Sequence, residues 1–169
     1  MGIIKIFFLA LIFGLAVYLG NNKANQYINR LQELVSIKSA LNILENKIKF
    51  TQCPLEEIFK DIAENCSEKN IKNMFEKLEI KQDTNMYESW KKTIKQIESN
   101  LNSEDKKILI DMGKILGTTD VDGQVSNIKI TSSFIDKQID KAEQEKNRNV
   151  KLFRTLGIIS GLTIIIILI

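Results

Sequence analysis

The chain of 169 residues contains no histidine, one proline and two cysteines. Without an imidazole, a Ser or Cys catalytic triad loses its usual general base. Cys53 and Cys66, thirteen residues apart, are too few ligands for a zinc site. The sequence has no glycine-rich phosphate-binding loop either. We therefore expect no enzymatic activity, no metal or other cofactor, and no small-molecule substrate.

An excess of basic charge is also missing. Lys5 and Arg154 belong to the apolar ends of the chain, and without them 22 basic residues stand against 21 acidic ones. Proteins that bind nucleic acid carry a basic footprint for the phosphate backbone. The near balance here argues against nucleic acid as a partner.

Long stretches almost without charge stand at both ends of the chain. Residues 2–20, GIIKIFFLALIFGLAVYLG, contain one charged residue, Lys5, and the last fifteen residues, TLGIISGLTIIIILI, contain none. A helix of about 19 residues is roughly 28 Å long and can cross the hydrocarbon core of a bilayer. The last stretch reaches a similar length when residues 152–154 are added, with Arg154 snorkelling to the surface. We expect transmembrane helices at residues 1–20 and 152–169.

A cleaved signal peptide is the alternative for the N-terminal stretch. Its apolar part is long for a signal peptide, and its basic region is a single lysine. The following residues, AVYLGNNKANQ, have no clear A-x-A cleavage site. A membrane anchor is therefore preferred.

Basic residues concentrate at the inner ends of the two apolar stretches. They are Lys23, Arg30, Lys137, Lys141, Lys146, Arg148, Lys151 and Arg154, whereas only Lys5 lies at the outer end of the first stretch. By the positive-inside rule, the middle domain is expected in the cytoplasm and both termini outside. Thiols stay reduced there, so Cys53 and Cys66 are expected to be packing residues.

Residues 21–151 carry apolar side chains at spacings of three and four, which is the pattern of amphipathic helices. We expect an all-α cytoplasmic domain, a bundle of about six helices. The first helix continues from the N-terminal stretch as far as Ile48. Pro54 suits the first position of the next helix, with Glu56 and Glu57 at the positive end of its dipole.

Polar residues mark the boundaries of the next helices. Ser67 is expected to cap a short third helix. The polar residues 81–85 separate it from a fourth helix, which carries Trp90. Ser103, followed by two acidic residues, opens a fifth helix, and Gly117 ends it.

The only tryptophan has two interpretations. Buried aromatic residues dominate the cores of small helical domains, so Trp90 is expected to pack on Val125 and Ile128 of the last helix. The alternative is that Trp90 anchors a partner protein at the surface.

The stretch LGTTDVDGQVSN, residues 116–127, resembles part of a calcium-binding loop. In that spacing the twelfth position, which should be a bidentate glutamate, is Lys129. From Val121 onward, apolar residues follow the three-four spacing of a long helix. Asp120 is therefore expected to be the N-cap of that helix, with Asp122 in its first turn, rather than a calcium ligand.

Small residues recur four apart in both apolar stretches, at Ala10 and Gly14 and at Gly157 and Gly161. Small residues at this spacing let membrane helices approach closely. Gly14 and Gly161 lie at equal depth from the inner boundaries, so we expect them to touch in an antiparallel hairpin. An oligomer built from these faces is the alternative.

The order of these features resembles the stage III sporulation protein AB family over nearly the full chain. The features are a membrane run, a TxxPLEE break, a helix centred on Trp90, and a charged helix that enters a terminal membrane run. Between them, LGxxDxxxQxxxI spans Leu116, Gly117, Asp120, Gln124 and Ile128. The chain departs from the family pattern at Cys53 and Gly123.

The resemblance implies a protein of the mother-cell membrane around the forespore in endospore-forming bacteria. The family is similar to the inner-membrane platform protein of type II secretion and type IV pilus machines. Its expected partners are other stage III sporulation proteins, including a cytoplasmic ATPase, stage III sporulation protein AA. The family has no catalytic residue to transfer to this chain.

Two functional hypotheses follow, and a third is weaker. The first is a non-enzymatic structural adaptor that holds an assembly at the membrane and engages the ATPase. The second is a stand-alone membrane receptor or regulator that senses with its helical domain. The third is a hydrolase that uses Glu45, Glu57 or Asp111, acids near apolar helix faces.

Overall fold

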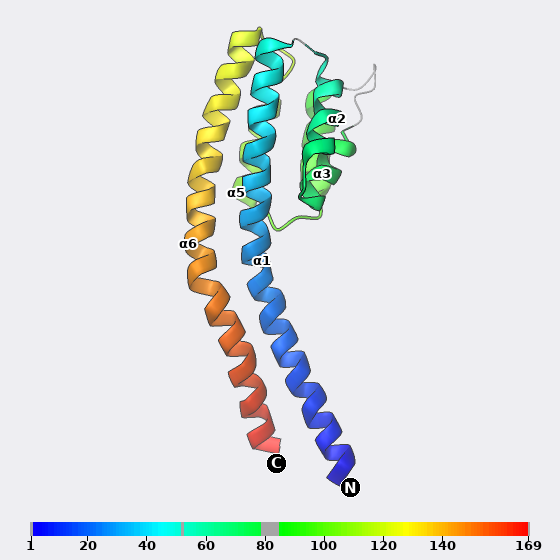
Figure 1. The fold of residues 1–169 in the computed structure, drawn as a ribbon, viewed down its shortest axis with the longest axis vertical. Helices are drawn as coiled ribbons and strands as arrows, with labels where there is room; N and C mark the ends of the chain where they lie inside the picture. The colour runs from blue at the N-terminus through cyan, green and yellow to red at the C-terminus, as the bar shows by residue number, and fades with distance from the viewer. Residues whose placement is uncertain (1, 52, 79–84, 169) are drawn as a thin grey trace. The chain divides into compact units, whose positions relative to one another are not determined.

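The computed structural model of the protein describes residues 2–51, 53–78 and 85–168, and these residues form helices and connecting turns without a strand (Figure 1). The helices are α1 (Gly2–Phe50), α2 (Leu55–Asn65), α3 (Lys69–Glu76), α4 (Met86–Gln96), α5 (Ser103–Gly113) and α6 (Val121–Leu168). The predicted all-α fold is confirmed. Of the predicted break at residues 81–85, residues 81–84 lie outside the described part.

The chain divides into two compact units. The end unit consists of Met1–Leu31 and Lys141–Ile169, and the central unit consists of Gln32–Asp140. Both α1 and α6 contribute residues to each unit.

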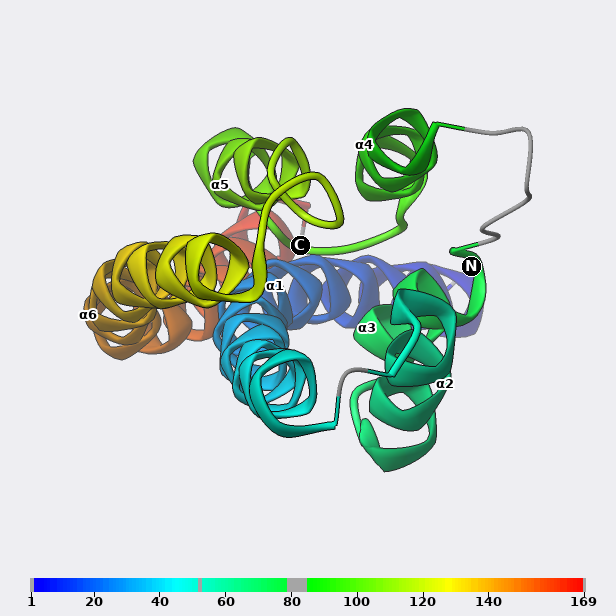
Figure 2. The same cartoon turned by 90° about the horizontal axis from the view of Figure 1, so that it is seen from above.

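In the central unit, α1 lies between α6 on one side and α2 with α3 on the other, and α4 and α5 cover a further side (Figure 1, Figure 2). The part of α1 in this unit buries the apolar residues Leu34, Ile37, Leu41, Leu44 and Ile48. They follow the spacing of threes and fours that the sequence shows. Full burial of such a side chain stabilises the fold by about 1.5–3 kcal/mol.

Trp90 is the largest side chain of the core and is 1 % exposed. Its indole nitrogen donates a hydrogen bond to the Leu109 carbonyl oxygen at 2.7 Å. The ring centroids of Phe59 and Phe75 lie 5.9 and 6.2 Å from that of Trp90. A Cβ atom on Gly113 would overlap the indole, so the ring packs directly against the α5 backbone. Trp90 thus joins α2, α3, α4 and α5.

The helix starts differ from the predicted ones by a single residue at α2 and α3. Pro54 precedes α2 as its N-cap, and its carbonyl accepts hydrogen bonds from Glu57 N at 3.0 Å and Ile58 N at 3.2 Å. Ser67 does not cap α3, because the Glu68 carboxylate accepts the hydrogen bond from Ile71 N at 2.7 Å. The Glu68 side chain is longer than that of serine, and it reaches the free Ile71 amide from the position that follows Ser67.

At α5 the cap is Asn102, and Ser103 is the first helical residue. Asn102 Oδ1 accepts from Asp105 N at 2.8 Å, and the Asp105 carboxylate accepts from Asn102 N at 2.9 Å. This reciprocal capping box satisfies two amides, which a lone serine cannot do. The helix ends at Gly113, earlier than predicted, and Gly117 follows in the next turn with a φ of 76°. That left-handed conformation suits glycine because it has no Cβ.

The end unit pairs the outer parts of α1 and α6 closely. A Cβ on Gly20 would lie 2.9 Å from the Gly157 Cα, and one on Gly157 would lie 3.1 Å from the Gly20 Cα. Further along, Tyr27 stacks on Phe153 with ring centroids 5.8 Å apart. Both α1 and α6 are also long and apolar enough to cross a membrane.

The expected contact between Gly14 and Gly161 is wrong. Nothing lies within 4 Å of a Cβ placed on Gly14, whereas one on Gly161 would lie 3.3 Å from the Ala16 Cβ. The face of α1 that meets α6 carries Phe13, Ala16 and Gly20, spaced three and four apart. Gly14 is rotated by about 100° from Phe13 because a helix has 3.6 residues per turn. Gly14 lies at the depth of Gly161, between Phe13 and Ala16, but on another face of α1.

Replacement of Trp90 by alanine should lower the free energy of unfolding by about 3–5 kcal/mol, because it leaves a cavity among four helices. Trp90→Phe, which keeps a ring but loses the hydrogen bond to Leu109, should cost less. The measurement is thermal unfolding of the full chain in detergent, followed by far-ultraviolet circular dichroism. Parent-like melting of Trp90→Ala would contradict the core role.

Cysteines in place of Ala16 and Gly161, in a chain with Cys53→Ser and Cys66→Ser, should oxidise to an intramolecular disulfide. The Cβ separation of 3.3 Å is close to the range that a disulfide requires. Gly14→Cys with Gly161→Cys is the matched control and should crosslink poorly. Migration on a non-reducing gel distinguishes the products, and a faster reaction of the control pair would refute the observed helix rotation.

Candidate interaction surface

Three residues of the LGxxDxxxQxxxI motif, Gly117, Asp120 and Gln124, lie where α5 turns into α6. Asp120 Oδ1 accepts a hydrogen bond from Gly123 N at 3.0 Å, which is the geometry of an N-cap. Gln124 Oε1 accepts from Gly117 N at 2.9 Å, and Gln124 Nε2 donates to the Thr119 carbonyl at 2.9 Å. A Cβ on Gly123 would lie 2.7 Å from the capping oxygen, so glycine leaves room for the cap. These polar groups hold the α5–α6 turn.

The other predicted site residues lie apart from this turn. Ile128 and Trp90 are each 1 % exposed in the core, so neither presents a surface to a partner. Pro54 is exposed before α2 in the same unit. Gly14 and Gly161 belong to the end unit, where Gly14 is exposed and Gly161 is buried. The structure therefore brings together Gly117, Asp120 and Gln124 only, and gives them a structural role.

The acids proposed for a hydrolase are on three different helices, α1, α2 and α5. Glu45 pairs with Lys129 at 3.7 Å, and Asp111 pairs with Lys114 at 2.6 Å. The Lys114 ammonium donates a hydrogen bond to the Asp111 carboxylate, and this bond raises the pKa of Lys114. Glu57 is exposed. Among the described residues, no three Cys, Asp or Glu side chains are grouped closely enough to hold a metal ion.

A buried carboxylate, which sequence reasoning missed, connects α1 to the segment between α4 and α5. Glu33 is fully buried and accepts three hydrogen bonds. They come from Asn70 Nδ2 at 2.8 Å, Asn100 N at 2.8 Å and Asn100 Nδ2 at 3.0 Å. The signal in the sequence was its spacing of four and seven residues from Ile37 and Ala40, which places Glu33 on a buried face.

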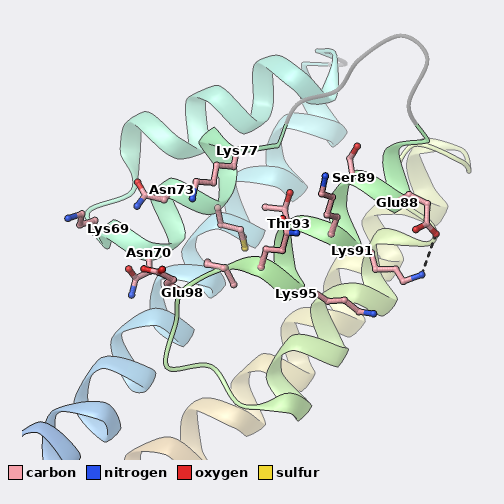
Figure 3. A pocket seen from close by; sticks show the side chains of 14 residues that line it. Lys69, Asn70, Asn73, Lys77, Glu88, Ser89, Lys91, Thr93, Lys95 and Glu98 are labelled. Carbon is pink, nitrogen blue, oxygen red and sulfur yellow. Dashed lines mark hydrogen bonds and ion pairs between the residues drawn. The ribbon is translucent and has the colours of Figure 1, made fainter.

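A cleft of about 1040 Å³ opens between α3 and α4 in the central unit (Figure 3). Its lining includes five lysines and two glutamates, a local charge of +3. The lysines are Lys69, Lys77, Lys91, Lys92 and Lys95, and the glutamates are Glu88 and Glu98. Asn70, which Glu33 holds, also lines the cleft. The near balance of 22 basic and 21 acidic residues, counted without Lys5 and Arg154, concealed this basic surface.

Comparison with known proteins adds three findings. Residues 5–169 match the family described as stage III sporulation protein AB. The chain is 24 % identical over 153 residues to stage III sporulation protein AB of Bacillus subtilis (strain 168), an alignment that covers 88 % of this chain and 90 % of that protein. A solved structure of stage III sporulation protein AB (SpoIIIAB) has a TM-score of 0.64 and 21 % identity, and covers 71 % of this chain and 98 % of its own. This last likeness supports the fold.

Replacement of Glu33 by alanine should lower the free energy of unfolding by about 3 kcal/mol, because three donors lose a charged acceptor in a buried place. Glu56→Ala is the matched control, since Glu56 makes an exposed ion pair with Lys60 on one helix. Such a pair contributes about 0.5 kcal/mol. Denaturant unfolding of the full chain in detergent compares the two, and equal effects would show that the buried carboxylate is not a stabilising contact.

Proposed function

Because the chain belongs to the stage III sporulation protein AB family, we propose that it is a non-enzymatic structural adaptor of a sporulation assembly at the membrane. The observation that carries the proposal is the position of the helical unit along the chain. The central unit, Gln32–Asp140, is flanked by the outer parts of α1 and α6, the two helices that are long and apolar enough to cross a membrane. A load on such a unit is transmitted to both anchors.

The proposal divides the chain into a transmembrane helix at residues 1–20, a cytoplasmic helical domain at residues 21–151 and a transmembrane helix at residues 152–169. The concentration of basic residues at the inner ends of the apolar stretches supports this orientation. The membrane is the mother-cell membrane around the forespore, with both termini facing out of the mother-cell cytoplasm.

The proposed neighbour in the cytoplasm is an ATPase, stage III sporulation protein AA. The role resembles that of the platform proteins of type II secretion and type IV pilus machines. Packing around Trp90 supports this role, because a rigid core lets the central unit transmit force. A stand-alone receptor is the competing function, and the open cleft between α3 and α4 is the feature that favours it.

A pull-down from sporulating cells distinguishes the adaptor from the receptor. The tagged full chain, extracted in a mild detergent, should retain other stage III sporulation proteins and the ATPase in constant ratio. An unrelated tagged membrane protein with two spans, expressed at the same level, is the control. Recovery of the chain alone, under conditions that keep other membrane complexes intact, would reject the adaptor.

Thiol labelling tests the proposed orientation in a non-sporulating bacterial host. Burial raises the pKa of the Cys66 thiol and makes it a slow reporter, so the probes are Cys53 and Asn147→Cys, each in a Cys66→Ser chain. The Asn147 probe also carries Cys53→Ser. Both probes should resist a membrane-impermeant maleimide in intact cells and react after permeabilisation.

Gly2→Cys, with Cys53→Ser and Cys66→Ser, is the matched control for labelling from outside. It should react in intact cells. Labelling of the Asn147 probe without permeabilisation would reverse the orientation.

A further inference from the structure

The cleft between α3 and α4 differs from the rest of the described surface in how its charges are matched. Elsewhere in the central unit, three lysines pair with a carboxylate of another helix. Lys38 pairs with Asp136 at 2.5 Å, and Lys47 pairs with Asp61 at 3.1 Å. In the cleft only Lys91 pairs with a carboxylate, that of Glu88 on the same helix at 3.4 Å. Within the described ranges, no carboxylate pairs with Lys69, Lys77, Lys92 or Lys95.

These four lysines stand on both sides of one concave surface. Lys69 and Lys77 lie at the two ends of α3, and Lys92 and Lys95 belong to α4. Figure 3 shows Lys69 and Lys77 on one side of the cleft and Lys95 on the other. Like charges that face each other repel, so their arrangement is stabilised when an anion lies between them.

The composition of the lining limits which anion fits. The lining residues include no arginine, glycine or aromatic residue. Sites for phosphate groups commonly use arginine forks or glycine-rich loops, and sites for single-stranded nucleic acid use aromatic stacking. Lysine offers a point charge, which suits separated carboxylates. The volume of about 1040 Å³ is also at the upper end of the range for small-molecule sites, and it accommodates a stretch of polypeptide.

Hydrogen bonds to the buried Glu33 hold the α3 side of the cleft and the segment that follows α4. Asn70 on the α3 side is bound to the buried Glu33, which also holds the Asn100 backbone beyond the end of α4. Met74 is 2 % exposed and lines the cleft together with the half-buried Ile97. The part of Ile97 that is exposed beside the lysines suits a segment in which an apolar side chain stands among acidic ones.

We propose that the cleft between α3 and α4 binds an acidic segment of a partner protein. Carboxylates of the segment pair with Lys69, Lys77, Lys92 and Lys95, and an apolar side chain of the segment rests on Ile97. This goes beyond the adaptor role, because the cleft would recognise such a segment whichever protein supplies it.

The test uses the full chain in a non-ionic detergent and a short fluorescent peptide of glutamates interrupted by leucine. Binding is measured by fluorescence anisotropy. Lys77→Glu with Lys92→Glu should weaken binding by about tenfold or more, since reversed charges repel the peptide. Lys60→Glu with Lys107→Glu changes the net charge equally on exposed residues outside the lining and should change the affinity by less than about twofold. Equal weakening by both variants would overturn the proposal.

A second arm locates the peptide. Thr93→Cys, in a chain with Cys53→Ser and Cys66→Ser, places a thiol in the cleft lining, and the acidic peptide should slow its reaction with a maleimide. Unchanged labelling at saturating peptide would overturn the assignment to this cleft. So would equal binding of a peptide with glutamine in place of glutamate, or tighter binding of a single-stranded oligonucleotide that the cleft variant abolishes.

Discussion

The four short helices of the central unit depend on α1 and α6 for their stability. They contain only 8 to 11 residues each, and isolated helices of that length are marginal in water. Each is attached by a polar contact to a long helix or to another short one. Asn127 of α6 donates to the Met112 carbonyl of α5 at 3.0 Å, and Glu33 of α1 holds Asn70 of α3. Around these contacts, Trp90 fills the space between α2, α3, α4 and α5. The apolar stripes of the two long helices are therefore the constraint from which the fold follows.

This dependence bears on function. The scaffold helices of the central unit are the same α1 and α6 whose outer parts are apolar enough for a membrane. A partner that binds the short helices would act on a surface stabilised by the two helices that are apolar enough to cross a membrane. The basic cleft between α3 and α4 is placed on such a surface, with one wall fixed through Glu33 to α1. A structural adaptor needs both a stable core and an exposed surface to which a partner can bind.

Much of the fold could be predicted from the sequence because it depends on local periodicity. The spacing of apolar residues gave the long first helix and the last one, and Asp120 was recognisable as a cap before Val121. Neighbouring polar residues compete for caps, so Glu68 caps α3 in place of the expected Ser67, and Asn102 caps α5 before the predicted first residue, Ser103. Helix rotation and the cleft depend on tertiary packing. That is why Gly14 was wrongly paired and why Glu33 and the lysines were overlooked.

Hydrogen exchange of the full chain tests most directly whether the short helices depend on α1. Leu34 is fully buried and Val35 is 51 % exposed, so the two neighbours on α1 form a matched pair. Leu34→Ala should accelerate amide exchange throughout α2, α3, α4 and α5, although none of these helices is altered, whereas Val35→Ala should leave the exchange rates unchanged. If Leu34→Ala accelerated exchange only within α1, the short helices would be stable without it, and the dependence argued above would be contradicted.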